Sequence, residues 1–137
     1  MSYISVQNVF FKYPHSNKNV LEDVSFVIEK GTYTAIVGLN GSGKSTLARL
    51  ISGLETPDSG KIIVQDKVKI GLVFQSPKEQ IISSVVHRDT AFGPQSYGLN
   101  KNEVELRTIE CLNIVDMLEY AETSSSALSL GQTQKIA

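Results

Sequence analysis

This 137-residue sequence has almost no net charge, a single cysteine and few prolines. The 13 Lys and Arg against 14 Asp and Glu leave a formal net charge of -1, which excludes the strong cationic field of a protein that binds nucleic acid through its phosphates. The one cysteine, Cys111, cannot form an internal disulfide, so a disulfide-stapled secreted module is excluded and a cysteine-based zinc finger is disfavoured. With 10 Gly and 4 Pro, the collagen-like and proline-rich classes are excluded as well.

Long apolar runs are also missing. No stretch approaches the ~20 apolar residues that span a bilayer, and residues 1–10 lack the basic start and apolar run of a signal peptide. We therefore expect a cytoplasmic chain, and peripheral attachment to a membrane complex stays open because it needs no spanning segment. The length and the 41% hydrophobic content predict one folded domain over residues 1–137.

Apolar patterning predicts strands in the first half of the chain and helices in the second. The segment 33–37 is short and almost wholly apolar, which is typical of a strand buried on both faces. In the helix expected from about 102 to 120, Cys111 lies on the apolar face and is predicted to be a small core residue. Strands are expected at 4–13, 24–28, 33–37, 61–64 and 68–74, and helices after residue 43, over 102–120 and from 129 onward.

The strongest motif is the glycine-rich run at 38–46, GLNGSGKST, which fits the Walker A pattern G-x-x-x-x-G-K-[ST] between an expected strand and an expected helix. Its glycines let successive backbone N–H groups converge on a polyphosphate, and the helix N-terminus adds donors and a positive dipole end. Lys44 would supply a full charge to the β- and γ-phosphates. The Ser45 hydroxyl suits Mg²⁺, and Thr46 suits an α-phosphate oxygen.

Several further motifs, taken together, resemble the ATP-binding subunit of an ABC (ATP-binding cassette) transporter over essentially the whole chain. Tyr13 stands at the position of the A-loop aromatic, Gln75 follows Val73-Phe74 at the position of the Q-loop glutamine, and residues 128–132, LSLGQ, match the signature LSGGQ. The resemblance implies an α/β fold of the P-loop NTPase type, with an N-terminal antiparallel β-subdomain and part of a helical subdomain. In this interpretation the chain stops before the Walker B strand.

The same resemblance implies a set of site residues, with ATP and Mg²⁺ as cofactors. Tyr13 would stack on adenine, although a strand-end tyrosine that packs on the sheet is the structural alternative. Gln75 would offer its amide oxygen to Mg²⁺, hydrogen-bond the attacking water and couple the site to a docking partner, the alternative being an exposed loop glutamine. The implied ATP-binding residues are Tyr13, Asn40, Gly41, Ser42, Gly43, Lys44, Ser45, Thr46 and Gln75, with Ser45 and Gln75 as the metal ligands.

The signature segment implies a second cassette. In the family, residues at the positions of Ser129, Gly131 and Gln132 close over the ATP of a partner subunit in a head-to-tail dimer. Leu130 stands where the family has glycine, and its side chain would hinder close approach of the backbone to a phosphate. This departure favours a heterodimer, in which the partner is a paralogue, over a homodimer.

Two further stretches resemble the energy-coupling-factor (ECF) branch, which takes up vitamins or transition-metal ions. These are a second glutamine after the Q-loop, Gln80, and the run AFGP at 91–94. The resemblance implies a transmembrane subunit that docks in a groove after the Q-loop, and a peripheral location on the cytoplasmic face of the membrane. His87 and Arg88 fall where acidic residues are usual, and His87 is expected to be a solvated surface residue and no metal ligand.

A general base for hydrolysis is not found in the sequence, since no acidic residue follows four apolar ones. The resemblance puts the Walker B aspartate and the catalytic glutamate beyond residue 137, so the chain alone is expected to bind ATP weakly and to hydrolyse it negligibly. Three other interpretations stay open: the ATPase of another ABC importer, a truncated and non-catalytic nucleotide-binding remnant, and a soluble ABC protein of repair or translation, which the near-neutral charge disfavours.

Overall fold

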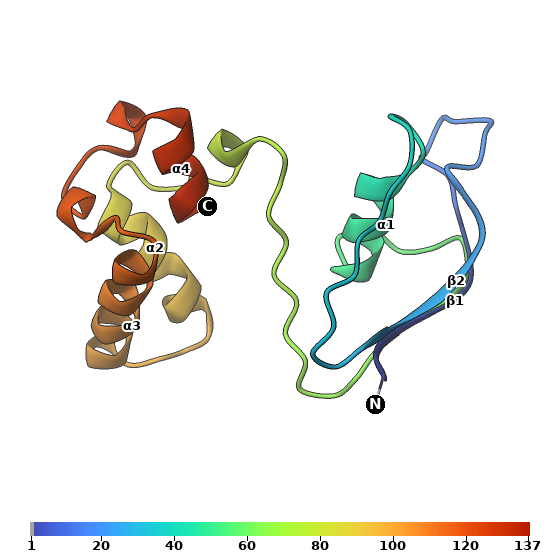
Figure 1. Cartoon of the computed structure of the whole chain (residues 1–137), viewed down its shortest axis with the longest axis horizontal. Coiled ribbons are helices and arrows are strands. Elements are labelled where there is room, and N and C mark those ends of the chain that lie inside the picture. The colour runs from blue at the N-terminus through green and yellow to red at the C-terminus, as the bar shows by residue number, and fades with distance from the viewer. Residues whose placement is uncertain (1) are drawn as a thin grey trace. The chain divides into compact units, whose positions relative to one another are not determined.

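The computed structural model describes residues 2–137, which form two compact units that divide after Leu72. The first unit contains an antiparallel sheet and one helix, and the second is helical (Figure 1). Within residues 2–137, no helix combines the length and the apolar character needed to cross a bilayer. The sheet of the first unit and the helices of the second confirm the predicted combination of an antiparallel β-subdomain with a helical one.

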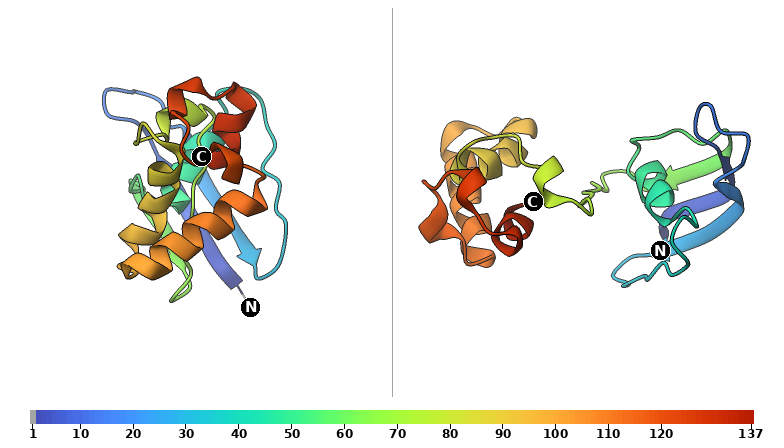
Figure 2. Two further views of the ribbon diagram at one scale, coloured as in Figure 1. Left: turned by 90° about the vertical axis from the view of Figure 1, so that its left-hand side faces the viewer. Right: turned by 90° about the horizontal axis from the view of Figure 1, so that it is seen from above.

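The first unit is built on a three-stranded sheet in which β1 is central and antiparallel to both neighbours, in the order β2-β1-β3. Helix α1 packs against one face of this sheet, as Figure 2 shows. The core lies between them and joins Val6, Val9, Phe11 and Leu21 of the strands to Leu47 and Leu50 of the helix. The elements are β1 (Ser2–Phe11), β2 (Leu21–Glu29), α1 (Lys44–Ile51) and β3 (Ser59–Val64).

A bulge in β1 sets which residues face this core. Val6 and Val9 are both buried although they are three positions apart, because Asn8 between them has a φ of 47° and shifts the register. The Asn8 side-chain amide donates to the Asp23 carboxylate at 2.7 Å, and its backbone N–H donates to the Ser25 hydroxyl at 2.8 Å. These bonds to β2 hold the bulge in place.

Two predicted strands, 33–37 and 68–74, are wrong in this structure. Neither segment belongs to a strand of the described sheet, and Tyr33 and Val37 are 98% and 87% exposed. The physical reason is that a strand exists only through its neighbours, and within residues 2–137 no other strand pairs with either segment. The apolar composition at 33–37 was correctly identified, but it describes a segment that the described sheet does not include.

The second unit is held by the contact between α2 and α3, which lie side by side in Figure 1. Its core contains Val86, Leu112 and Met117. Helix α3 begins with a capping box, in which the Asn100 side chain accepts from the Glu103 backbone N–H and the Glu103 carboxylate accepts from that of Asn100. The elements are η1 (Pro77–Glu79), α2 (Val86–Ser96), α3 (Lys101–Ile114), η2 (Leu118–Tyr120), η3 (Ser125–Ala127) and α4 (Leu130–Ile136).

Three details of the helical unit differ from expectation. Helix α3 ends at Ile114 and not near Tyr120, because Asp116 takes a φ of 54°, which an α-helix does not allow. Cys111 is exposed and is not a core residue, since the buried face of α3 is formed by its neighbour Leu112 and by residues one and two turns earlier. Helix α2 was not anticipated, because its Gly93 and Pro94 are weak helix formers.

The bulge at Asn8 predicts an unequal effect of two glycine substitutions. Gly60 and Gly53 both have positive φ, of 85° and 77°, but a Cβ at Gly60 would collide with the Asn8 carbonyl, whereas a Cβ at Gly53 would meet open space. We expect Gly53→Ala to cost about 1–2 kcal/mol of unfolding free energy through backbone strain alone. Gly60→Ala should cost about 3 kcal/mol or more, because the β1 backbone must also move. Urea unfolding of both variants checks this, and equal losses would contradict it.

Candidate nucleotide-binding site

The phosphate-binding motif predicted at 38–46 consists of a loop, 38–43, and the first three residues of α1, and the shape of the loop depends on two glycines with positive φ. Gly41 and Gly43 have φ values of 81° and 89°. A Cβ at Gly43 would lie 2.8 Å from the Leu21 methyl carbon and 3.0 Å from the Val20 carbonyl oxygen. The end of the loop therefore packs directly onto the start of β2, where only glycine fits.

The Lys44 side chain lies back over this loop. Its ammonium donates to the carbonyl oxygens of Gly38 and Leu39 at 2.9 and 2.8 Å. Gly43, the N-cap of α1, provides no side-chain cap, so the first N–H groups of the helix have no side-chain acceptor. A full positive charge and free helical donors thus meet at one point, which is the arrangement that suits a phosphate group.

The two hydroxyl residues after Lys44 have different environments. Ser45 is exposed, and within the described residues its hydroxyl has no hydrogen-bond partner, so it is available to a Mg²⁺ ion bound beside the phosphates. Thr46 is buried, and its hydroxyl is 3.1 Å from the Tyr13 hydroxyl. The other loop residues predicted to bind ATP, Asn40 and Ser42, are exposed.

Tyr13 connects the end of the first strand to the phosphate loop. Its ring is half-buried, packs edge-to-face on Phe11 at a centroid distance of 5.0 Å and borders the core. The hydroxyl bond to Thr46 brings two predicted site residues together, a contact that no sequence signal indicated. Stacking of this ring on adenine stays a prediction.

Gln75 belongs to the second unit and is exposed. Its neighbour Phe74 donates its backbone N–H to the Gln80 side-chain oxygen at 2.8 Å. Gln80, one of the residues that resemble the ECF branch, thus closes a short loop around Gln75. A loop closed by a side chain carries no periodic signal, so only the structure shows it.

The signature residues form the N-terminus of α4. The Ser129 hydroxyl accepts from the Gln132 backbone N–H at 3.3 Å, and the Gln132 side chain accepts from the Ser129 backbone N–H at 2.9 Å. Ser-x-x-Gln is a capping-box pattern, so the sequence held the signal for this pair. Leu130 is 63% exposed, and a Cβ at Gly131 would meet nothing within 4 Å.

His87 is neither solvated on all sides nor part of a group of metal ligands. Its Nε2 lies 3.2 Å from the Glu105 carboxylate, so it joins α2 to α3. Within residues 2–137 no three His, Cys, Asp or Glu side chains gather into a set that could hold a metal ion. His87 was expected to be a solvated surface residue, and this is only partly correct, because just 25% of its side chain is exposed.

Comparison with known proteins identifies the family. A family model described as ABC transporter matches residues 21–137. The energy-coupling factor transporter ATP-binding protein EcfA1 of Staphylococcus aureus strain MRSA252 is 42% identical over an alignment of 147 positions that covers 99% of this chain and 55% of EcfA1. The chain thus spans about half the length of the curated relatives it matches, and because it has only 137 residues, the alignment includes positions that it lacks.

Solved structures agree with this assignment. The chain superimposes with a TM-score of 0.81 and 28% identity on cbiO1 from Clostridium perfringens, described as part of the ABC transporter complex cbiONQ, over 98% of this chain and 59% of cbiO1. A structure described as the ATP binding subunit of an ABC transporter gives a TM-score of 0.76 and 26% identity, over 98% and 59% of the two chains. The phosphate loop, its packing on the start of β2 and these matches together show that the chain belongs to the ATP-binding domains of ABC transporters.

Proposed function

We propose that this chain binds ATP with Mg²⁺ as part of the energy-coupling ATPase subunit of an ECF-type transporter that takes up a vitamin or a transition-metal ion. The observation that carries the proposal is the Lys44 ammonium, held over a glycine loop at the uncapped N-terminus of α1. The 42% identity to EcfA1 supports the ECF assignment, and the likeness to cbiO1 supports membership of an ABC transporter complex.

The mechanism of ATP binding follows from the loop. Lys44 can exchange its two carbonyl acceptors for β- and γ-phosphate oxygens, which as anions form stronger bonds with an ammonium. The uncapped N–H groups at the start of α1 would then bind the remaining oxygens, and Thr46 would serve the α-phosphate. Ser45, together with Gln75, would hold Mg²⁺, which supplies charge neutralisation between the phosphates when bound.

The signature segment would serve the ATP of a second cassette in a head-to-tail dimer. Its Ser129 hydroxyl oxygen accepts from the Gln132 backbone N–H at 3.3 Å, so the hydroxyl proton can still be donated to a phosphate oxygen. Gly131 leaves open space for a close approach, whereas the exposed Leu130 side chain lies beside it. This asymmetry supports a heterodimer whose partner has glycine at that position.

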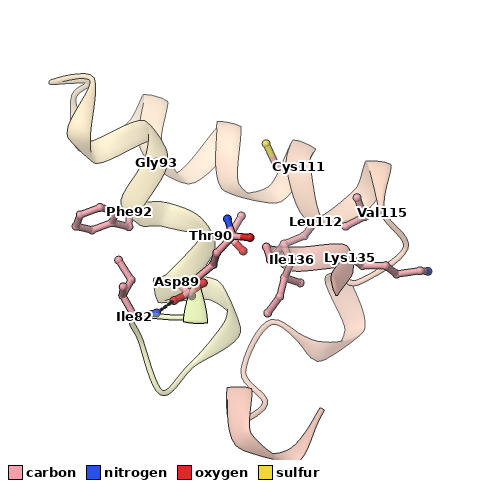
Figure 3. Close-up of a pocket in the computed structure, with 12 residues that line it drawn as sticks. Ile82, Asp89, Thr90, Phe92, Gly93, Cys111, Leu112, Val115, Lys135 and Ile136 are labelled. Atoms are coloured by element: carbon pink, nitrogen blue, oxygen red, sulfur yellow. Dashed lines mark hydrogen bonds between the residues drawn. The ribbon is translucent and has the colours of Figure 1, made fainter. Parts of the chain in front are cut away.

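A transmembrane subunit is the second partner that we propose, and the helical unit contains a cavity suited to it. The cavity, of about 370 Å³, is drawn in Figure 3. Its apolar lining comes from α2, α3 and α4, from the segment before α2 and from the residue that follows α3, and Phe92 and Ile82 are 55% and 62% exposed. Docking there would place the chain on the cytoplasmic face of the membrane. The apolar lining residues are Ile82, Phe92, Leu112, Val115 and Ile136.

ATP binding by the loop is tested with Lys44→Ala. We expect the dissociation constant for ATP with Mg²⁺ to rise at least about tenfold, because the only side-chain cation of the loop is lost; that corresponds to about 1.4 kcal/mol. Lys18→Ala removes an equal charge from an exposed turn of the same unit and should leave binding unchanged. Isothermal titration calorimetry measures both, and equal affinities of the two variants would refute the proposed site.

Tyr13 distinguishes adenine stacking from a purely structural role. Tyr13→Phe keeps the ring but removes the bond to Thr46, and should leave ATP affinity within about twofold. Tyr13→Leu keeps apolar packing without an aromatic face, and should weaken ATP binding about fivefold or more while inorganic tripolyphosphate binds as before. If Tyr13→Leu weakens both ligands equally, or neither, the ring does not contact adenine.

Turnover is the third test. No acidic residue of this sequence follows an apolar strand in the manner of a Walker B aspartate and its neighbouring base, so we expect the 137-residue polypeptide to bind ATP without releasing phosphate at a measurable rate. A coupled phosphate-release assay checks this. Steady turnover that survives repeated purification, and that Lys44→Ala abolishes, would show that a base exists within residues 1–137.

A further inference from the structure

Residues 74–83, which we call the Gln75 loop, are held at both ends by side-chain oxygens. At the first end, the Gln80 side-chain oxygen accepts from the Phe74 backbone N–H at 2.8 Å. At the second end, one oxygen of the Asp89 carboxylate accepts from the backbone N–H groups of Ile82 and Ser83, both at 2.7 Å. Three backbone donors of the loop are therefore satisfied by only two side chains.

The second end is fixed more firmly than an ordinary surface loop. Asp89 lies in the first turn of α2, and a carboxylate that accepts from two N–H groups forms charge-assisted bonds. The Ser83 carbonyl accepts from the buried Ser125 hydroxyl at 2.8 Å, and the Ser84 carbonyl accepts from the Ser125 N–H at 2.9 Å. Both backbone groups of Ser83 are thus bound. Its N–H donates to Asp89 of α2, and its carbonyl oxygen accepts from Ser125, which lies shortly before the signature residues.

The same two side chains also line the cavity of the helical unit. Gln80 and Asp89 both border it, and Figure 3 shows Asp89 bonded to the backbone beside Ile82, with Phe92 close by. Any group that enters the cavity therefore meets the two side chains that fix the Gln75 loop. Gln75 is the residue after Phe74, whose backbone N–H donates to the Gln80 side chain.

We propose that Gln80 and Asp89 are positioning residues that set where Gln75 lies, and that they do so through the Phe74, Ile82 and Ser83 N–H groups. The inference rests on the proposed role of Gln75 toward Mg²⁺ and extends it. A glutamine on an exposed loop has many backbone conformations, and contributes to a metal site only where the loop is ordered in advance. Neither residue is expected to touch the nucleotide itself.

The first experiment follows the loop by NMR in the full 137-residue chain without nucleotide. Gln80→Ala should shift the Phe74 amide proton upfield, speed its exchange with solvent about tenfold, and broaden the Gln75 side-chain amide signals. Gln80→Glu keeps an acceptor oxygen and should restore the Phe74 amide. In the same way, Asp89→Asn should retain the Ile82 and Ser83 amides that Asp89→Ala releases. Gln95→Ala, which removes an exposed glutamine of α2, is the matched control and should change none of these signals.

The second experiment measures the ratio of ATP affinities with and without Mg²⁺. Gln80→Ala should lower this ratio about as much as Gln75→Ala does, and the double variant should lower it no further, because the two changes act on one element. Additive losses, or an unchanged ratio in Gln80→Ala where Gln75→Ala lowers it, would overturn the proposal.

The two experiments separate the inference from the function on which it rests. If Gln75→Ala leaves the Mg²⁺ ratio unchanged, the proposed metal role of Gln75 fails. The NMR result then decides the positioning role by itself. Broadened Gln75 signals in Gln80→Ala that Gln80→Glu restores would support it, and unaltered Phe74 and Gln75 signals would refute it.

Discussion

The packing of α1 onto β1 and β2 is the contact on which the phosphate loop depends. Leu47 and Leu50 join the strand residues in one core, and this fixes where the helix begins. Gly43 then meets the start of β2 so closely that no side chain fits. Because the helix N-terminus and the loop are both set by this contact, the Lys44 ammonium and the free helical N–H groups come together at one place.

The helical unit is ordered differently, by side chains that bind backbone groups. The ends of the Gln75 loop are tied by Gln80 and Asp89, α3 starts at a capping box of Asn100 and Glu103, and α4 starts at another one. Its main apolar cluster is small, with three buried residues and five half-buried neighbours. When such bonds break, the Gln75 loop can move while the apolar core of the unit stays folded. A loop of this kind can change position when a partner docks beside it.

The parts predictable from the sequence were those with local signals. The glycine pattern predicted the loop and the start of α1, and β-prone runs predicted β1, β2 and β3, because these segments pair with one another. The strand expected at 33–37 failed, since burial of a strand depends on neighbours that residues 2–137 do not provide. The Tyr13–Thr46 bond and the Gln80 closure could not be read from periodicity, since both join side chains through tertiary geometry.

Hydrogen exchange at the phosphate loop tests the central claim most directly, because it reports on the backbone donors that are assigned to the phosphates. Saturating ATP with Mg²⁺ should slow amide exchange across residues 38–47 about tenfold or more, and should slow it by a smaller factor in the strands of the sheet. AMP with Mg²⁺, which lacks the β- and γ-phosphates, should slow it little. Exchange in this segment that ATP leaves unchanged, at a concentration that saturates binding, would contradict the account.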